Sequence, residues 1–382
     1  MHILEPSIGI FLHYLMLTQN PAVPIHTPTT VSDALSEKYY PSLNGLRGIS
    51  IIMVVLMHLS LSGNYFYLTI FNGGLGVGIF FVLSGFLITT LCLKEQKQTG
   101  TLLLKDFYVR RLLRIFPVAY LYILVVFLLN YFYHSPAAWF QYAGAICYIL
   151  NFSYFRKNQN APELNHMWSL AVEEQFYIIF PFILKKSYKA FFWSIIFIVV
   201  ILPLICCVQE MYKPLSNGVL YYFTHYFIKF QSIAVGCLLS MLAFDKKLNF
   251  KWLLQYKLTG NLIAIFLILY LGFDQFYSVK SMFINLIISV LVAYIIITNI
   301  IPSTDFIYKF LNNRFLSLLG VLSYSVYIWQ QMFVFGSSKW PHWLVTYPSN
   351  LIFIIIVPCL SYFFYEKYFL KLKTRFSKLK IA

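Results

Sequence analysis

The sequence predicts an all-helical bundle that crosses a membrane about ten times, with both termini in the cytoplasm. Of the 382 residues, 60% are hydrophobic and only 11% are charged, against about 25% charged in soluble domains. Apolar runs of about 20 residues, enough for a helix to cross a hydrocarbon core of ~30 Å, recur along almost the whole chain. Backbone groups in lipid must bond within their own segment, so these runs are predicted to be helices. The predicted spans are 43–62, 73–93, 115–133, 167–184, 190–209, 218–243, 260–273, 281–300, 315–336 and 347–369.

The basic residues lie between these spans and predict their direction. The loop after the second span is rich in lysine and arginine, every second loop after it is also basic, and the intervening loops carry few such residues. Basic loops stay on the cytoplasmic side. The apolar segment that starts at Ala137 could be an eleventh span, but it would then move most later basic residues outside. It is therefore predicted to lie on, or dip into, the outer face.

Composition also bears on domains and partners. Residues 1–40 are predicted to be an N-terminal tail without stable structure, 41–370 the transmembrane domain and 371–382 a basic cytoplasmic tail. The net charge of +16 lies in the loops rather than on one aromatic-studded basic face, which argues against a nucleic-acid partner. Most of the six cysteines lie inside apolar runs and none form a C-x-x-C pair. Packing roles are favoured over disulfides, and no metal site is predicted.

The first span carries two unusual residues, Arg47 and His58, in the stretch PSLNGLRGISIIMVVLMHLSL. Eleven residues turn a helix by three turns plus about 20° and advance it by about 16 Å, so both side chains share a face. A charge at mid-bilayer costs at least ~2.5 kcal/mol, and such residues usually line a polar cavity. Histidine suits a general base near neutral pH, and the arginine fork suits phosphate or an oxyanion. The helix alone is equally compatible with Arg47 reaching the cytoplasmic headgroups and His58 packing as a neutral residue.

Five blocks in order resemble the acyltransferase-3 family of integral-membrane O-acyltransferases. They are LNGLRGISIIMVVLMHL, GGLGVGIFFVLSGFLIT, FYVRRLLRIFPVAYLY, HMWSLAVEEQFYIIFP and LGVLSYSVYIWQQ, within residues 40–370. The resemblance implies transfer of an acyl group, usually acetyl, from cytoplasmic acetyl-CoA to a hydroxyl of a cell-surface glycan or lipid-linked sugar. The implied location is the cell membrane, with acyl-CoA as co-substrate and no permanently bound cofactor. Arg47 and His58 match the family's essential pair.

The chain also departs from the family pattern. Gly78 stands where the family commonly has aspartate, so a contact made by that carboxylate cannot be carried over. Tyr368 replaces a common proline, which bears only on how the last helix ends. The chain ends soon after the tenth span, so the hydrolase-like soluble domain of some relatives is not expected.

Charged residues in two other blocks are further candidates. Three arginines are expected to open a helix on the cytoplasmic side and to hold the phosphates of coenzyme A, namely Arg110, Arg111 and Arg114. The alternative is that they serve only as a positive-inside signal, which requires positive charge but not arginine specifically. Glu173 and Glu174 lie in an otherwise apolar helix and point about 100° apart, so at most one is expected to face a given partner. One is predicted to pair with an arginine or to orient His58. Helix packing is the alternative.

The remaining candidates would contact the acceptor. His166 and Trp168 are predicted at the outer surface, either at the acceptor or in an aromatic interface belt. A polar stripe in the ninth span would line the acceptor channel or form interhelical hydrogen bonds, with equal weight; it comprises Ser323, Tyr324, Tyr327, Gln330 and Gln331.

Two other functional classes compete with the acyltransferase. A secondary transporter could use an intramembrane arginine and histidine as a substrate or proton site, but the two halves show no repeat and no matched pair of broken helices. An inactive membrane scaffold is disfavoured by the intact Arg47 and His58 pair.

Overall fold

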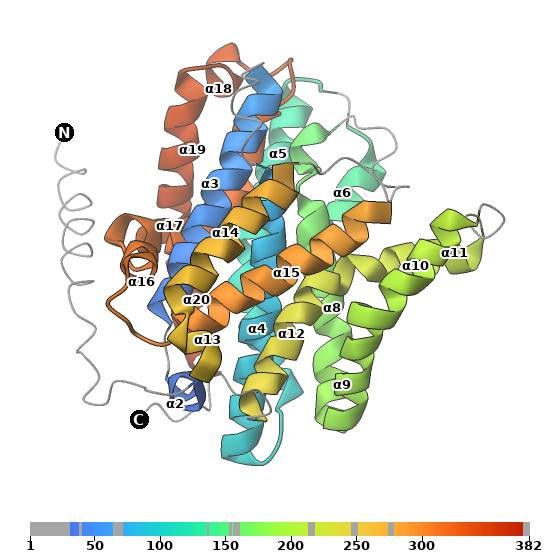
Figure 1. Ribbon diagram of the computed structural model, residues 1–382. Coiled ribbons are helices and arrows are strands. Elements are labelled where there is room, and N and C mark those ends of the chain that lie inside the picture. The colour runs from blue at the N-terminus through green and yellow to red at the C-terminus, as the bar shows by residue number, and fades with distance from the viewer. Residues whose placement is uncertain are drawn as a thin grey trace.

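The computed structural model describes residues 31–37, 40–63, 72–135, 137–152, 155, 161–212, 218–245, 251–273 and 279–376, and within them every regular element is a helix (Figure 1). The first half contains α2 (Val31–Ser36), α3 (Pro41–Gly63), α4 (Gly73–Thr99), α5 (Leu104–Phe132), α6 (Trp139–Ile146), η2 (Pro162–Leu164), α8 (Met167–Lys186), α9 (Tyr188–Ile196) and η3 (Phe197–Ile201). The second half contains α10 (Leu202–Met211), α11 (Val219–Phe227), η5 (Ile228–Phe230), α12 (Gln231–Phe244), α13 (Lys251–Gln255), α14 (Lys257–Phe273), α15 (Val279–Asn299), α16 (Phe306–Leu311), α17 (Arg314–Val334), α18 (His342–Val345), α19 (Ser349–Leu360), η6 (Ser361–Glu366) and α20 (Lys367–Thr374).

The helical membrane bundle predicted from the apolar runs is confirmed, and each predicted span falls on a helical segment. Eight segments in the described residues are long and apolar enough to cross a membrane. Of the other two predicted spans, α14 is shorter, and α17 carries the polar stripe that lowers its hydropathy. The number of crossings and the cytoplasmic termini therefore stay predictions. With eight residues, α6 is too short to cross.

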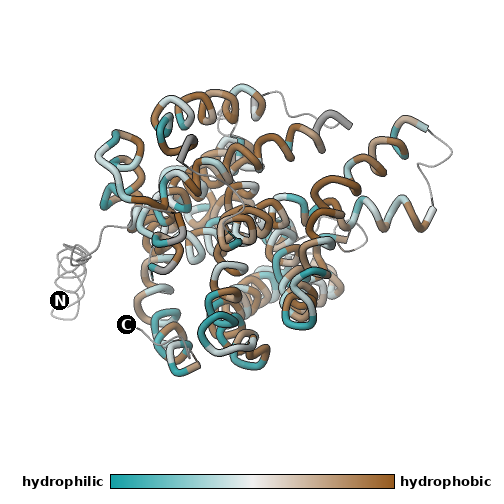
Figure 2. The backbone as a smooth tube through the Cα atoms, turned by 60° about the horizontal axis from the view of Figure 1, so that its bottom comes forward, coloured by the Kyte–Doolittle hydropathy of each residue, from teal (hydrophilic) through white to brown (hydrophobic). Residues whose placement is uncertain are grey.

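Hydrophobic residues cover most of each long helix, and hydrophilic residues gather toward the helix ends (Figure 2). Large apolar side chains remain exposed along these helices, including Phe127, Tyr131 and Phe266. Lipid is the natural solvent for such surfaces because its chains are as apolar as these side chains. The α10–α11 hairpin extends away from the rest of the bundle (Figure 1).

Glycines allow the two most extensive helix pairs, α3 with α17 and α4 with α12, to approach closely. A Cβ added at Gly320 would lie 1.9 Å from the Asn44 carbonyl oxygen, and one at Gly85 would lie 1.9 Å from the Ile233 carbonyl oxygen. Neither position has room for a side chain. The packing role predicted for Gly85 is confirmed.

The ends of the chain differ from the prediction. In α2, Val31, Ala34 and Leu35 are buried in the main hydrophobic cluster, so the predicted tail is helical and packed in this part. Residues 1–30 of that tail lie outside the described residues. At the other end, the last helix continues through η6 into α20 and reaches Thr374, while 377–382 lie outside the described residues.

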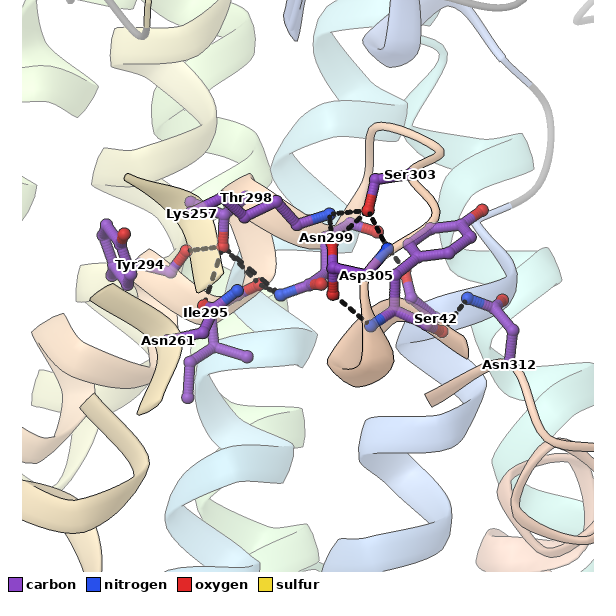
Figure 3. A network of polar contacts seen from close by, with 11 residues as sticks. Ser42, Lys257, Asn261, Tyr294, Ile295, Thr298, Asn299, Ser303, Asp305 and Asn312 are labelled. Atoms are coloured by element: carbon purple, nitrogen blue, oxygen red, sulfur yellow. Dashed lines mark hydrogen bonds and ion pairs between the residues drawn. The ribbon is translucent and has the colours of Figure 1, made fainter. Parts of the chain in front are cut away.

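A buried polar network joins the start of α14 and the end of α15 to the start of α3 (Figure 3). Lys257 forms an ion pair with Asp305 at 3.0 Å and donates to Ser303 at 2.9 Å. The Ser42 hydroxyl of α3 donates to the Asn299 carbonyl at the end of α15. Because Ser42 lies just before the part of α3 that carries Arg47, the network holds that part of the helix in place.

Candidate active site

A cavity of about 430 Å³ lies among α3, α4, α5, α8 and α17. The lining residues from α4 are mostly apolar, and the charged lining residues come from α3, α5, α8 and α20. Its walls bring together many of the predicted site residues, namely Arg47, Arg111, Arg114, Glu173, Ser323, Tyr324 and Tyr327. His58, Trp168 and Gln330 are not part of its lining.

Arg47 enters this cavity from α3. Its Nη1 donates to Asn44 Oδ1, one turn earlier on the same helix, at 3.2 Å. The charge of Arg47 interacts with those of Arg114, Glu173 and Arg111. The expectation that an intramembrane arginine lines a polar cavity is therefore confirmed.

Arg111 holds both candidate glutamates. Its Nη2 lies 3.0 Å from Glu173 Oε2, and its Nε lies 3.0 Å from Glu174 Oε1. The guanidinium also stacks 3.8 Å above the Tyr177 ring. The prediction that at most one glutamate faces a given partner is wrong, because the planar guanidinium fork presents separate donors to both carboxylates. Neither glutamate has a hydrogen bond to His58 among the described residues.

The three clustered arginines have three different environments. Arg110 pairs with Glu95 at 2.6 Å and donates to the Phe376 carbonyl at 2.8 Å, away from the cavity wall. Arg114 lines the cavity and has no hydrogen bond or ion pair with any described residue. The helix also begins earlier than predicted, at Leu104. The arginines therefore lie within α5 rather than opening it.

His58 is fixed by α17. Its Nδ1 lies 3.0 Å from Gln330 Oε1, and its ring meets the edge of Phe335 at a centroid distance of 5.5 Å. An amide oxygen can only accept a hydrogen bond, so in this arrangement Nδ1 carries the proton and Nε2 keeps its lone pair. Of the two roles predicted for Gln330, channel lining or interhelical hydrogen bonding, the structure shows the second, because this bond joins α17 to α3 and orients the histidine.

His166 is buried, which corrects the prediction that it lies at the outer surface, whereas its neighbour Trp168 is partly exposed. His166 is 3% exposed and lies between the rings of Tyr122 and Tyr327, at centroid distances of 5.3 and 5.4 Å. Trp168 is partly buried and packs edge-on against Phe81. The η2 turn packs against α17, and this packing brings His166 into the bundle interior.

The polar stripe of α17 both lines the cavity and links helices. The Tyr327 hydroxyl bonds Ser169 Oγ at 2.5 Å and the His166 carbonyl at 2.9 Å. The Tyr324 hydroxyl donates to the Ile115 carbonyl at 2.6 Å. Ser323 donates within its own helix, to the Gly320 carbonyl at 2.8 Å. Interhelical bonding is thus confirmed for both tyrosines, and an acceptor role for the stripe stays a prediction.

Sequence reasoning did not single out two charged residues near these arginines. Glu366 is buried at the end of η6, bonds Ser325 and interacts with the charge of Arg114. The sequence could have indicated Glu366, because an acidic residue inside an apolar span is usually functional. Lys373 lines the cavity from α20, and its position in a basic tail gave no signal.

Two other expectations concern Gly78 and metals. A Cβ added at Gly78 meets no atom within 4 Å, so the aspartate common in the family would have space there. No group of three or more histidine, cysteine, aspartate or glutamate residues that could hold a metal ion occurs in the described part of the chain.

Fold and site together define a multi-pass membrane protein with a charged intramembrane cavity. The chain belongs to the acyltransferase-3 family, whose acyltransferase domain model matches residues 40–366. O-acetyltransferase OatA of Staphylococcus aureus (strain NCTC 8325 / PS 47) is 32% identical over 321 residues, which cover 77% of this chain and 50% of OatA. A Staphylococcus aureus (strain COL) protein, provisionally named as an O-acetyltransferase, is 33% identical over 315 residues, covering 76% of this chain and 50% of its own. The chain thus spans about half the length of these curated relatives. No solved structure matches it.

Proposed function

We propose that this protein transfers an acyl group, acetyl by analogy with its relatives, from cytoplasmic acyl-CoA to a hydroxyl of a cell-surface glycan or lipid-linked sugar. The observation that carries the proposal is the cavity that receives Arg47, Arg111 and Arg114, together with a histidine fixed beyond it on the same helix as Arg47. Family membership and the names of the relatives support the reaction class.

In the proposed reaction, Arg47 and Arg114 bind phosphates of the donor, since neither forms an ion pair with a described carboxylate. His58 Nε2 accepts the proton of the acceptor hydroxyl as its oxygen attacks the thioester carbonyl. The carbon–sulfur bond then breaks, and the departing thiolate takes up that proton from His58 to give free coenzyme A. The positive-inside pattern supports an orientation in which these arginines face the cytoplasm, and it is compatible with the proposed location in the cell membrane.

The test is release of coenzyme A from acetyl-CoA by the purified protein, with and without a surface-glycan extract. His58→Gln should lower transfer by about 10²- to 10⁴-fold, the usual contribution of a general base, while the protein still inserts and folds. His342→Gln, an exposed histidine on α18, is the matched control. Near-normal transfer by His58→Gln would refute the mechanism. Acetyl-CoA left intact by the wild-type protein would favour a transporter or a scaffold.

The acceptor can be sought separately. Mass spectrometry of surface polysaccharides from cells with and without this protein should show an acetyl-sized loss when the protein is missing. An unchanged glycan profile would argue against a glycan acceptor.

A further inference from the structure

The last helix of the described chain reaches back to the cavity from outside the family domain. The family model ends at residue 366, whereas α20 runs on to Thr374 and packs along α5. Beyond α20, the Phe376 carbonyl accepts a hydrogen bond from Arg110 at 2.8 Å, which ties this end of the chain to α5. With α20 held there, Lys373 becomes part of the cavity wall.

Lys373 lies among positive charges. Its ammonium interacts with the charges of Arg114, Arg110, Arg111 and Arg47. The ammonium forms no hydrogen bond or ion pair with a described residue. Like charges brought together at a partly buried site repel each other. An arrangement that holds them together is therefore better suited to a bound anion than to the empty cavity.

Glutamates neutralise only part of this cluster. Arg110 is paired with Glu95, and Arg111 is paired with both glutamates of α8. Arg114 interacts with the charges of Glu366 and Glu173 without forming an ion pair with either. The cations left without an ion-pair partner in the described residues are Arg47, Arg114 and Lys373, all on the cavity wall. Three such charges from three separate helices match a ligand with several phosphate charges.

We propose that Lys373 is a phosphate-binding residue of the donor site and that α20 closes the site over the nucleotide part of acyl-CoA. This inference rests on the proposed function. The thioester must reach His58, whereas the phosphates must lie near Arg47, Arg114 and Lys373, whose charges interact with one another. A lysine ammonium is a compact point charge that binds phosphate without demanding a planar two-point contact.

The chain offers a matched control two residues away. Lys371 is on the same helix, is exposed and does not line the cavity. Binding of acetyl-CoA, 3′-dephospho-acetyl-CoA and acetyl-pantetheine to the purified full chain should be compared for wild type, Lys373→Met and Lys371→Met. Lys373→Met should weaken acetyl-CoA binding by about tenfold, as expected for loss of one charged hydrogen bond, and should leave acetyl-pantetheine unaffected. Lys371→Met should bind all three ligands like the wild type.

The dephospho ligand identifies the phosphate involved. If the effect of Lys373→Met disappears with 3′-dephospho-acetyl-CoA, the lysine binds the 3′-phosphate; if it persists, the lysine binds the diphosphate. Either result supports the inference. Equal acetyl-CoA binding by the two lysine variants would overturn it, as would equal weakening toward acetyl-pantetheine. If the wild-type protein binds none of the three ligands, the proposed function itself fails.

Thermal unfolding separates binding from folding. Removing Lys373 relieves repulsion, so Lys373→Met should melt at or above the wild-type temperature without ligand and gain less stability when acetyl-CoA is added. Lysine in a purely structural role would give the opposite result, a lower melting temperature without ligand and an unchanged gain. Lys373→Arg, which keeps the charge, should retain most of the binding.

Discussion

Replacing Arg111 by methionine should destabilise the bundle strongly, although its neighbour Arg114 can be replaced at little cost. Arg111 is the described ion-pair partner of both Glu173 and Glu174, and the three side chains are between 9% and 14% exposed. Methionine retains an apolar stem against Tyr177 but leaves the two carboxylates without a cation. Arg114 has no such partner in the described chain, so its removal leaves no unpaired carboxylate.

The magnitude follows from the cost of leaving buried charges unpaired. Removing one partner of a buried ion pair typically costs about 3–5 kcal/mol. Loss of the guanidinium from the face of Tyr177 adds about 1 kcal/mol. We therefore expect Arg111→Met to lower the free energy of unfolding by about 4–6 kcal/mol. Arg114→Met should change it by less than about 1 kcal/mol while weakening acetyl-CoA binding.

The assay is reversible unfolding in mixed detergent micelles, with acetyl-CoA binding measured on the same samples. The triple variant Arg111→Met, Glu173→Gln, Glu174→Gln removes all three charges and should recover most of the lost stability. A loss below 1 kcal/mol for Arg111→Met would refute the reasoning. So would a triple variant no more stable than the single one.

Two further predictions concern packing and sidedness. Gly320→Ala should lower the free energy of unfolding by about 1–3 kcal/mol through overpacking, because its Cβ would lie 1.9 Å from the Asn44 carbonyl oxygen; an unchanged value would mean that the crossing of α3 and α17 can relax. The sidedness test uses a variant without the exposed native Cys147. In intact cells, Ser338→Cys should react with a membrane-impermeant thiol reagent and Gln98→Cys should not. Labelling at Gln98 would show that the protein has the opposite orientation in the membrane.

Apolar length and charge placement were enough to predict the helical bundle, because lipid leaves the backbone few alternatives. The number of membrane crossings was harder to predict from hydropathy. The stripe from Ser323 to Gln331 lowers the hydropathy of α17, yet this helix packs against α3 in the bundle. Apart from Ser323, the polar side chains of the stripe find hydrogen-bond partners outside α17, which hydropathy alone does not register.

The site was predictable where a motif fixed both residue and face, as for Arg47. It was not predictable where the choice of partner depended on tertiary contacts. Arg110 and Arg111 are adjacent and chemically identical, yet they point about 100° apart on α5 and meet different glutamates. The same limit applies to Lys373, whose role follows from where α20 packs rather than from its sequence.

The spacing of Arg47 and His58 narrows the role of the arginine. About 16 Å of helix axis separates them, and only Arg47 lines the cavity. Arg47 also donates to Asn44, one turn further from His58 along α3, so its guanidinium is directed away from the histidine. Of the two roles that suit an arginine here, this arrangement favours phosphate binding over a contact with an oxyanion beside His58. A donor with its phosphates at one end and its thioester at the other could contact both residues, and the Tyr327 ring, held by Ser169 and His166, lies on the wall between them.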